Sequence, residues 1–302
     1  MHRRKFLKYT AGFALGATAI GFALPTSAKK QIAIPIAKLI TQNFLDSRIQ
    51  ENILRLKQDS PSLIIGETHC HSNFSDGTYP IKDIMMRAVA LGLDFIIFTE
   101  HLTMDLYPLE HLLGSFKEQW RQLYRWDHKY FKPITVYPGF EVSTAQGHLI
   151  IVFPQAYLNP KMYHNISQSF IRFDKEIAPM EEAARLAKYL GGITIIPHPE
   201  VRRSYPFGAT LPFIRKNLLG LVDAIEDIST GHGYEVNFSA KLNLASIGSS
   251  DDHLNLILGT TVTGYDSTRH SDLLSAIKAH ETSALKVEGS LTPIFAGLRK
   301  LL

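Results

Sequence analysis

The sequence predicts a single α/β domain, most simply a barrel of strands with helices on its outside. Short runs of β-branched and apolar residues alternate with amphipathic stretches, and the runs end in polar clusters. No Gly/Ser-rich linker divides the chain after its N-terminal segment. Such alternation is typical of a parallel sheet with crossover helices. With 302 residues, 45% hydrophobic and 20% charged, the composition is that of a globular protein rather than a disordered or fibrous chain.

The first residues have the pattern of an export signal. Residues 1–10 contain four basic residues and no acid, an apolar run of 11–24 follows, and small residues lead to Ala28. The run is too short to span a membrane comfortably but suits a signal peptide, and its basic start resembles a twin-arginine signal. We expect residues 1–28 to be a signal peptide that the twin-arginine export machinery recognises. The protein is then periplasmic or otherwise exported, without stable membrane insertion after cleavage; an uncleaved signal would tether it.

Charge and cysteine content exclude several classes of partner and site. The predicted signal holds four of the 32 Lys and Arg and none of the 28 Asp and Glu, so the remaining chain has a net charge of zero. This balance gives no electrostatic support for nucleic-acid binding, and we expect no nucleic-acid partner. Cys70 is the only cysteine, which rules out an intrachain disulfide and zinc sites built on several cysteines.

The elements of the predicted domain follow one another regularly. Residues 29–61 have apolar residues at helical spacing and predict an N-terminal helical segment, and residues 62–302 hold the barrel. Strands are expected at 63–69, 95–101, 134–141, 148–153, 193–198, 221–226 and 245–251. Helices are expected near 80–91, 109–130, 180–190, 234–242 and 270–280.

Ionisable residues end five of the expected strands. In α/β barrels the carboxyl ends of the strands carry the active site. One His or Asp at such an end is ordinary turn chemistry, but five polar ends together are hard to assign to turns. The residues are His69, His101, Glu141, His198 and Asp251.

Two short motifs have the spacing of metal ligands. Residues i and i+2 of a strand point the same way, so His69 and His71 can direct both imidazoles at one metal. Asp251 and His253 repeat this arrangement with a carboxylate. Ligands of mixed Asp, Glu and His suit zinc, manganese or iron. Cys70 should point away between its two neighbours, and we expect a packed structural thiol.

The order of the motifs resembles the PHP (polymerase and histidinol phosphatase) domain family over roughly residues 62–265. The motifs are His-x-His, Ser-Asp-Gly, Thr-Glu-His, Gly-Phe-Glu, a His that starts a strand, Pro-His-Pro and Ser-Asp-x-His. The resemblance implies a distorted (β/α)7 barrel with two or three divalent metal ions, Mn, Zn or Fe, and a glutamate, Glu141, that bridges two of them. The implied metal ligands are His69, His71, Asp76, His101, Glu141, His148, His198, Asp251 and His253.

The sequence departs from the family pattern at two acidic residues. Glu100 and Glu67 stand where the family usually or often has Asp, and we expect both to orient imidazoles. Arg202 and Arg203 closely follow His198, and we expect contact with a phosphate from either one, although a solvated basic turn is the alternative. Glu100, Arg202 and Arg203 are the predicted catalytic residues. Asp252 has no role that the sequence suggests.

The predicted function is that of an exported, metal-dependent phosphoesterase acting on small phosphorylated substrates. Two or three bound metal ions, possible in such a site, would activate a water for attack on phosphorus. Two alternatives stay open at this point: a metallohydrolase of a non-phosphate bond, and a non-catalytic metal-binding protein.

Overall fold

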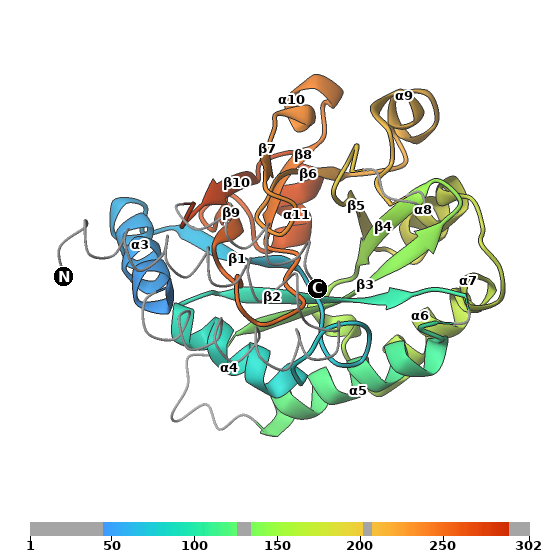
Figure 1. Cartoon of the computed structure of the whole chain (residues 1–302), viewed down its shortest axis with the longest axis horizontal. Coiled ribbons are helices and arrows are strands. Elements are labelled where there is room, and N and C mark those ends of the chain that lie inside the picture. Colours follow the sequence, from blue (N-terminus) through green and yellow to red (C-terminus); the bar gives the residue numbers. More distant parts are fainter. Residues whose placement is uncertain (1–44, 105, 126–133, 202–206, 290–302) are drawn as a thin grey trace, which may run out of the picture.

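A computed structural model describes residues 45–104, 106–125, 134–201 and 207–289 (Figure 1). Within these ranges one sheet of ten strands curls into a half-barrel, with helices on its outer side. The predicted α/β fold class is therefore confirmed. The predicted signal peptide lies outside the described residues, and the boundaries at 28 and 61 stay predictions. In the part of the chain described, no helix is both long and apolar enough to cross a membrane.

The strands and helices alternate over most of the chain. The strands are β1 (Leu63–Cys70), β2 (Phe95–Leu102), β3 (Thr135–Thr144), β4 (Gly147–Val152), β5 (Ile193–Ile196), β6 (Ala224–Ser229), β7 (Tyr234–Glu235), β8 (Ala245–Ser249), β9 (Thr261–Asp266) and β10 (Ser283–Lys286). The helices are α3 (Asp46–Asp59), α4 (Ile81–Leu91), α5 (Leu109–Arg125), η2 (Gln155–Tyr157), α6 (Pro160–Ser169), α7 (Ile171–Lys175), α8 (Met180–Tyr189), α9 (Leu211–Phe213), η3 (Ile214–Leu218), α10 (Phe238–Leu242) and α11 (Leu273–Lys278).

The sheet is mixed, whereas the alternation of elements predicted a parallel one. Its order is β10-β9-β1-β2-β3-β4-β5-β6-β7, with β8 paired to β6. Strand β4 runs antiparallel to both β3 and β5. Only residues 145–146 separate β3 from β4, and a parallel connection needs a dozen residues or more. The chain therefore makes a hairpin here, and β4 begins rather than ends at the edge that carries the site.

The curl of the sheet brings its distant strands together. Strand β8 lies parallel to β6, and an isolated parallel bridge joins Cys70 to Asp252 just beyond the end of β8. The Thr68 hydroxyl also donates a hydrogen bond to the Gly248 carbonyl at 3.2 Å. The carboxyl ends of β1 and β8 thus lie side by side, although about 180 residues separate them in sequence.

Alternation along each strand separates two layers of core. The inward-facing residues Ile97, Tyr137, Ile150, Ile195 and Ile247 pack in one apolar cluster inside the curl. Their neighbours on the outward faces pack against the surrounding helices in a second, larger cluster. In the direction of the site, the next inward side chains are polar: Thr99 on β2, Glu141 on β3 and His148 on β4. The inner apolar layer thus forms the floor beneath the polar strand ends.

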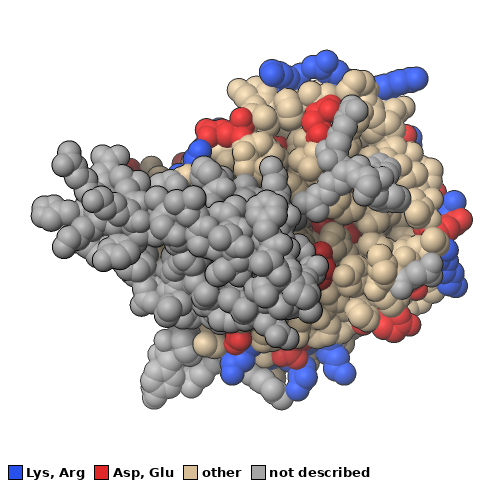
Figure 2. Space-filling view, viewed as in Figure 1, with Lys and Arg blue, Asp and Glu red and all other residues tan. Residues whose placement is uncertain are grey.

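The helices follow their sequence signals with small shifts. Helix α4 begins directly after Pro80 and ends at Gly92, whose φ of 88° lies in the left-handed region that glycine favours at helix C-termini. The predicted helix at 234–242 is shorter than expected, because its first residues form β7 and only Phe238–Leu242 is helical. On the face shown in Figure 2, charged side chains of both signs lie around the margin of the described surface.

Candidate metal centre

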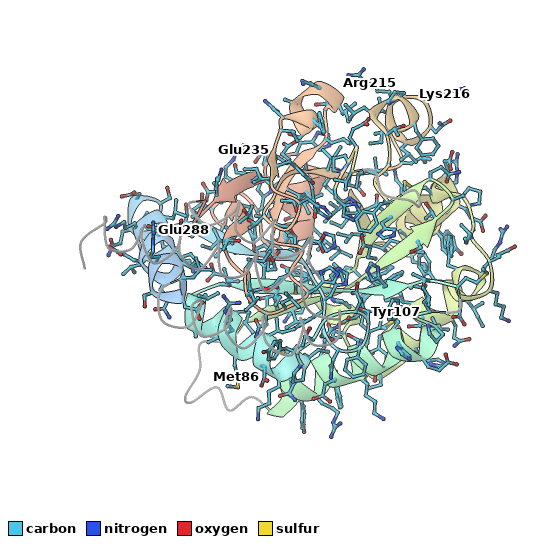
Figure 3. All side chains as sticks on the ribbon, viewed as in Figure 1. Met86, Tyr107, Arg215, Lys216, Glu235 and Glu288 are labelled. Atoms are coloured by element: carbon cyan, nitrogen blue, oxygen red, sulfur yellow. The ribbon has the colours of Figure 1, made fainter. Side chains whose placement is uncertain are left out.

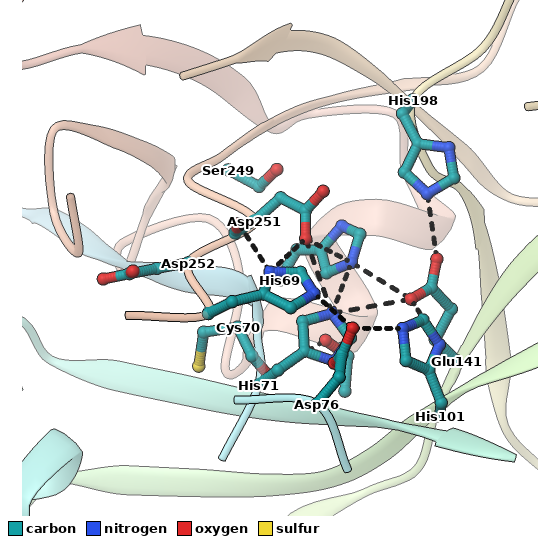
Figure 4. A network of polar contacts seen from close by, with 12 residues as sticks. His69, Cys70, His71, Asp76, His101, Glu141, His198, Ser249, Asp251 and Asp252 are labelled. Atoms are coloured by element: carbon teal, nitrogen blue, oxygen red, sulfur yellow. Dashed lines mark hydrogen bonds and ion pairs between the residues drawn. The ribbon is translucent and has the colours of Figure 1, made fainter. Parts of the chain in front are cut away.

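A bulge at the end of β1 directs the first two imidazoles into the curl. The register between β1 and β2 shifts between Glu67 and Cys70. Bulges of this kind re-aim side chains near active sites. Glu67 accepts hydrogen bonds from the backbone N–H groups of Thr68 and His69 within the bulge. Beyond it, His69 and His71 face inward, whereas the Cys70 sulfur points away from them, as Figure 4 shows, and packs in the outer core.

The nine predicted ligands lie together at the strand ends. They form four overlapping groups. Within each group, one ligand atom from every residue lies within 4.8 Å of the ligand atoms of the others. Together the groups contain every predicted ligand: His69, His71, Asp76, His101, Glu141, His148, His198, Asp251 and His253. The sequence positions that the motifs selected on separate strands therefore converge on one buried cluster.

Glu141 lies at the centre of this cluster. Its Oε1 lies 2.9 Å from Nδ1 of His148 and 2.9 Å from Nε2 of His198. Its Oε2 lies 3.2 Å from Nδ1 of His101 and 3.4 Å from Nε2 of His69. The two oxygens face different pairs of imidazoles, an arrangement that would let one carboxylate serve two ions (Figure 4).

The spacing of three ligand atoms, those of His69, His71 and Glu141, fits a divalent ion. The Nε2 atoms of His69 and His71 lie 3.1 Å apart. Oδ1 of Asp251 lies 3.4 Å from each of them, and Oε2 of Glu141 lies 3.4 and 3.5 Å from them. Ligands about 2.1 Å from a tetrahedral ion are about 3.4 Å apart, which the separations among His69, His71 and Glu141 match. Nitrogen and carboxylate donors of this kind suit first-row divalent metals.

Electrostatics also favour a cation in the cluster. Burial, together with the neighbouring His253 and His101, lowers the pKa of His71 to about 3, and burial lowers that of His198 to about 4. Burial alone would lower the pKa of His101 as well, but the Glu141 and Asp76 carboxylates raise it to about 9. Neutral imidazoles at His71 and His198 offer lone pairs to a metal. His101 instead keeps its proton, because the carboxylates around it favour a positive charge at this position.

The cluster opens to solvent on one side. The Asp76 side chain is 35% exposed and that of His253 is 18% exposed, whereas His69, His71 and Glu141 are at most 1% exposed. Asp76 and His253 lie 3.1 Å apart between Oδ2 and Nε2. A substrate would approach the buried ligands past these two residues.

Two ligands have strained backbone. His198 has a φ of 32° and Asp251 a φ of 49°, in the region that residues other than glycine seldom adopt. Such conformations cost about 1–3 kcal/mol each and cluster at functional sites, where surrounding structure holds them. Each is the second residue after the end of its strand, β5 or β8, so the sharp change in chain direction turns the two side chains into the cluster.

Sequence reasoning missed the carboxylate that orients His69. Glu226 on β6 lies 2.7 Å from Nδ1 of His69 and also accepts hydrogen bonds from the His198 backbone N–H and the Ser249 hydroxyl. Because a carboxylate only accepts, Nδ1 of His69 carries the hydrogen, and Nε2 is the nitrogen that faces the cluster. Glu226 lies in an expected strand at a position whose side chain points inward. This alternation along the strand was the one sequence feature that could have indicated its role.

His232 is a further residue of the site whose role the sequence left open. It follows β6 closely, and its Nε2 lies 2.7 Å from Oδ2 of Asp251. Its imidazole thus contacts the oxygen of Asp251 opposite the one that faces His69 and His71. No motif in the sequence marks this position.

Glu100 and Glu67 do not contact the imidazoles through their carboxylates in the described part of the chain, although both were expected to orient them. Glu100 points outward from β2 and accepts hydrogen bonds from the hydroxyls of Ser72, Ser75 and Ser115. The strand alternation places His101 inside and Glu100 outside. Glu100 therefore fixes the loop after β1, and Glu67 holds the bulge described above.

Asp252, which lacked an expected role, organises the loop after β8. Its carboxylate accepts hydrogen bonds from the backbone N–H groups of Leu254, Ile257 and Leu258. It points away from the cluster in Figure 4, as Cys70 does. Arg202 and Arg203, the other predicted catalytic residues, lie outside the described residues.

The comparisons with known proteins agree with this architecture. Residues 67–201, which contain seven of the nine predicted ligands, match the family model described as the PHP domain. The resemblance of the motifs to that family is thus supported, over less than half of the chain. No curated protein matches the chain.

Several solved structures are similar in fold. PsfC from Pseudomonas syringae aligns over 80% of this chain and 97% of its own, with 15% identity and a TM-score of 0.50. A two-domain protein from Bacteroides vulgatus containing a predicted PHP-like metal-dependent phosphoesterase aligns over 74% of this chain, with 20% identity and a TM-score of 0.49. The alignment spans 65% of that two-domain chain.

One further similar structure concerns the expected partners. Endonuclease Q, in complex with a 27-mer duplex that carries an abasic lesion, aligns over 72% of this chain and 56% of its own, with 17% identity and a TM-score of 0.48. The expectation that nucleic acid is excluded stays a prediction. Similarity at these levels of identity shows the fold alone.

Proposed function

We propose that the protein is a metal-dependent phosphoesterase that hydrolyses small phosphorylated substrates at a site for two or three divalent ions, Mn, Zn or Fe. The observation that carries the proposal is the convergence of nine His, Asp and Glu side chains in overlapping groups around Glu141. The family match over residues 67–201 supports the same class of hydrolase.

The residues of the chain divide the work of such a reaction. His69, His71 and Glu141 would hold one ion, and His101, Glu141 and His148 would hold another. Bound divalent ions lower the pKa of water toward neutrality and neutralise developing charge on phosphoryl oxygens. Glu226 keeps His69 in the required tautomer, and Asp76 and His253 border the side from which the substrate enters. This arrangement needs no serine or cysteine nucleophile.

Phosphate release by the full chain tests the proposal. The protein is stripped of metal, reloaded with manganese or zinc, and assayed on an aryl phosphate and a panel of sugar phosphates and nucleotides, with a chelated control. We expect release that depends on metal and is abolished by His71→Ala, but retained by His164→Ala on the exposed side of α6. Absence of release from protein shown to hold its metals would contradict the proposal and favour hydrolysis of another bond.

Two expectations from the sequence remain part of the proposal. Arg202 and Arg203 are proposed to bind the phosphate, and an Arg202→Ala/Arg203→Ala variant should weaken inhibition by inorganic phosphate if they do. Export through the twin-arginine pathway is proposed from the N-terminal segment. Fractionation of cells that express the full chain would test it, with Arg3→Lys/Arg4→Lys as the variant expected to stay in the cytoplasm.

A further inference from the structure

Two aromatic rings that hold no metal ligand atom lie against the imidazoles of the cluster. Tyr107 stacks on His101, with ring centroids 5.8 Å apart and an angle of 25° between the planes. Phe207 stacks on His198 at 4.4 Å and 28°, and its centroid lies 4.6 Å from that of His148. Both rings are partly exposed. Their faces and edges therefore border both the ligands and the solvent.

The two rings flank the cluster from opposite sides of a strand pair. Tyr107 follows β2 and Phe207 follows β5, and in the sheet β3 and β4 lie between these strands. Figure 3 shows Tyr107 within the outline of the molecule, whereas Arg215 and Lys216 lie at its upper edge. The ring of His148 bridges the gap, with its centroid 5.3 Å from His101 and 5.4 Å from His198. Phenyl, phenol and imidazole rings thus surround Glu141 from the loop after β2 to the loop after β5.

Backbone contacts fix both rings independently of the ligands' side chains. The Phe207 carbonyl accepts a hydrogen bond from the backbone N–H of His148 at 3.0 Å. A Cβ on Gly147 would lie 3.0 Å from the Phe207 carbonyl oxygen, and one on Gly208 would lie 2.2 Å from the His198 carbonyl oxygen. The two glycines thus allow the segment that carries Phe207 to approach the β3–β4 turn and His198 closely.

Tyr107 is held in a similar way by a small hairpin. Its carbonyl accepts from the Thr103 N–H at 3.1 Å, and its own N–H donates to the Thr103 hydroxyl at 3.1 Å. The preceding residue, Leu106, is 73% exposed. The turn that carries Tyr107 therefore also exposes an apolar side chain to solvent.

We propose that Tyr107 and Phe207 select phosphate esters whose alcohol part carries a flat ring. With the phosphoryl group at the ligands, the alcohol part must extend along the wall that these rings border. Aromatic faces there favour a planar group by stacking. The inference rests on the proposed phosphoesterase function and names its substrate class, with Phe207 expected to contribute more because it packs against two of the imidazoles.

Two esters of nearly equal chemistry separate stacking from reactivity. Benzyl phosphate and cyclohexylmethyl phosphate both release a primary alcohol of similar size, but only the first has a flat ring. For the metal-loaded full chain we expect a higher kcat/KM with benzyl phosphate. Phe207→Leu and Tyr107→Leu should each lower that preference about 3- to 10-fold, the effect of losing one aromatic pair. Phe207→Tyr should preserve it.

Matched variants and a binding assay distinguish two roles of Tyr107 and Phe207: selection of the substrate, and structural support of the neighbouring imidazoles. Phe213→Leu and Tyr189→Leu, away from the cluster, should leave the preference unchanged. Benzylphosphonate, which cannot be hydrolysed, should bind the loaded protein in calorimetry and lose affinity in Phe207→Leu, while metal content stays the same. Equal losses for both esters, or weaker metal binding with an unchanged preference, would overturn the inference. If neither these esters nor the aryl phosphate, sugar phosphates and nucleotides release phosphate, the proposed function fails, and phosphonate binding still decides the role of the rings.

Discussion

Buried carboxylates around the strand ends occur in two layers with different neighbours. In the ligand layer, Glu141, Asp76 and Asp251 face imidazoles. Burial alone would raise the pKa of Glu141, but His148, His69 and His101 hold it well below its usual range. In the support layer, Glu67, Glu100, Glu226 and Asp252 accept hydrogen bonds from backbone N–H groups, hydroxyls or a single imidazole. There burial raises the pKa of Glu67 to about 7 and also raises that of Glu100.

The comparison teaches how a fold can bury many acids near one another. Neutral dipoles satisfy Glu67 and Glu100, whereas Glu226 also pairs with His69 and Asp252 with Arg87; all four hold the backbone or side chains that position the ligands. The ligand layer instead surrounds its carboxylates with groups that must be cationic or must bind a cation. The two layers therefore differ in what the removal of a carboxylate should do, and the following predictions test that difference.

The largest effect is expected from the centre of the ligand layer. Glu141→Gln removes the charge that two sets of imidazoles share, so the metals should be lost. Phosphate release should fall by about 10³-fold, because bound metals contribute several kcal/mol of transition-state stabilisation. Metal content after dialysis and phosphate release measure the result. Glu100→Gln, which keeps an acceptor oxygen for its serines, should retain its metal; a loss equal to that of Glu141→Gln would break the distinction between the layers.

Glu226 is the member of the support layer that touches a ligand, and its effect should be intermediate. Glu226→Gln can no longer fix the tautomer of His69, and such outer partners contribute about 10- to 100-fold in metal affinity. Titration with a competing zinc chelator measures it. Glu235→Gln on β7, an exposed residue paired with Lys286, is the matched control. Unchanged affinity in Glu226→Gln would show that the strand alone orients His69.

Metal affinity should rise with pH. His101 has a pKa of about 9 without metal, so below that pH an ion must displace its proton in order to bind. The apparent affinity should increase about tenfold per pH unit for each displaced proton between pH 6.5 and 9. Chelator competition at several pH values measures the slope. A flat profile over this interval would show that no proton leaves the ligand layer on binding.

The smallest effect on catalysis is expected from Asp252, whose role is to organise a loop. Asp252→Ala leaves the N–H groups of Leu254, Ile257 and Leu258 without their acceptor, and each buried unsatisfied group costs about 1–3 kcal/mol. Thermal unfolding should therefore occur at a lower temperature, with phosphate release reduced far less than in Glu141→Gln. Asp59→Ala, at the exposed end of α3, serves as the control. Loss of metal without loss of stability would place Asp252 in the ligand layer.

The sequence predicted the ligand layer better than the support layer. Its members stand in short motifs at the strand ends, where local alternation already aligns His69 with His71 and Asp251 with His253. Glu100 is a glutamate like Glu141 and lies directly beside His101. The alternation of side chains along β2 nevertheless turns it outward, to three serines. Glu226 lies in no motif, because its partner His69 is 157 residues away and only the closed sheet brings them together.

The amino-acid sequence by itself determined the alternation of strands and helices, the outward packing of Cys70 and the kinds of donor at the strand ends. These features depend on periodicity and residue chemistry, which are local. Only the tertiary structure decided the antiparallel course of β4, the bulge in β1, the pairing of Glu226 with His69 and the aromatic wall of Tyr107 and Phe207. The bulge, the Glu226–His69 pair and the aromatic wall depend on the approach of segments distant in sequence, which the curl of the sheet sets, whereas the two-residue connection after β3 turns β4 back.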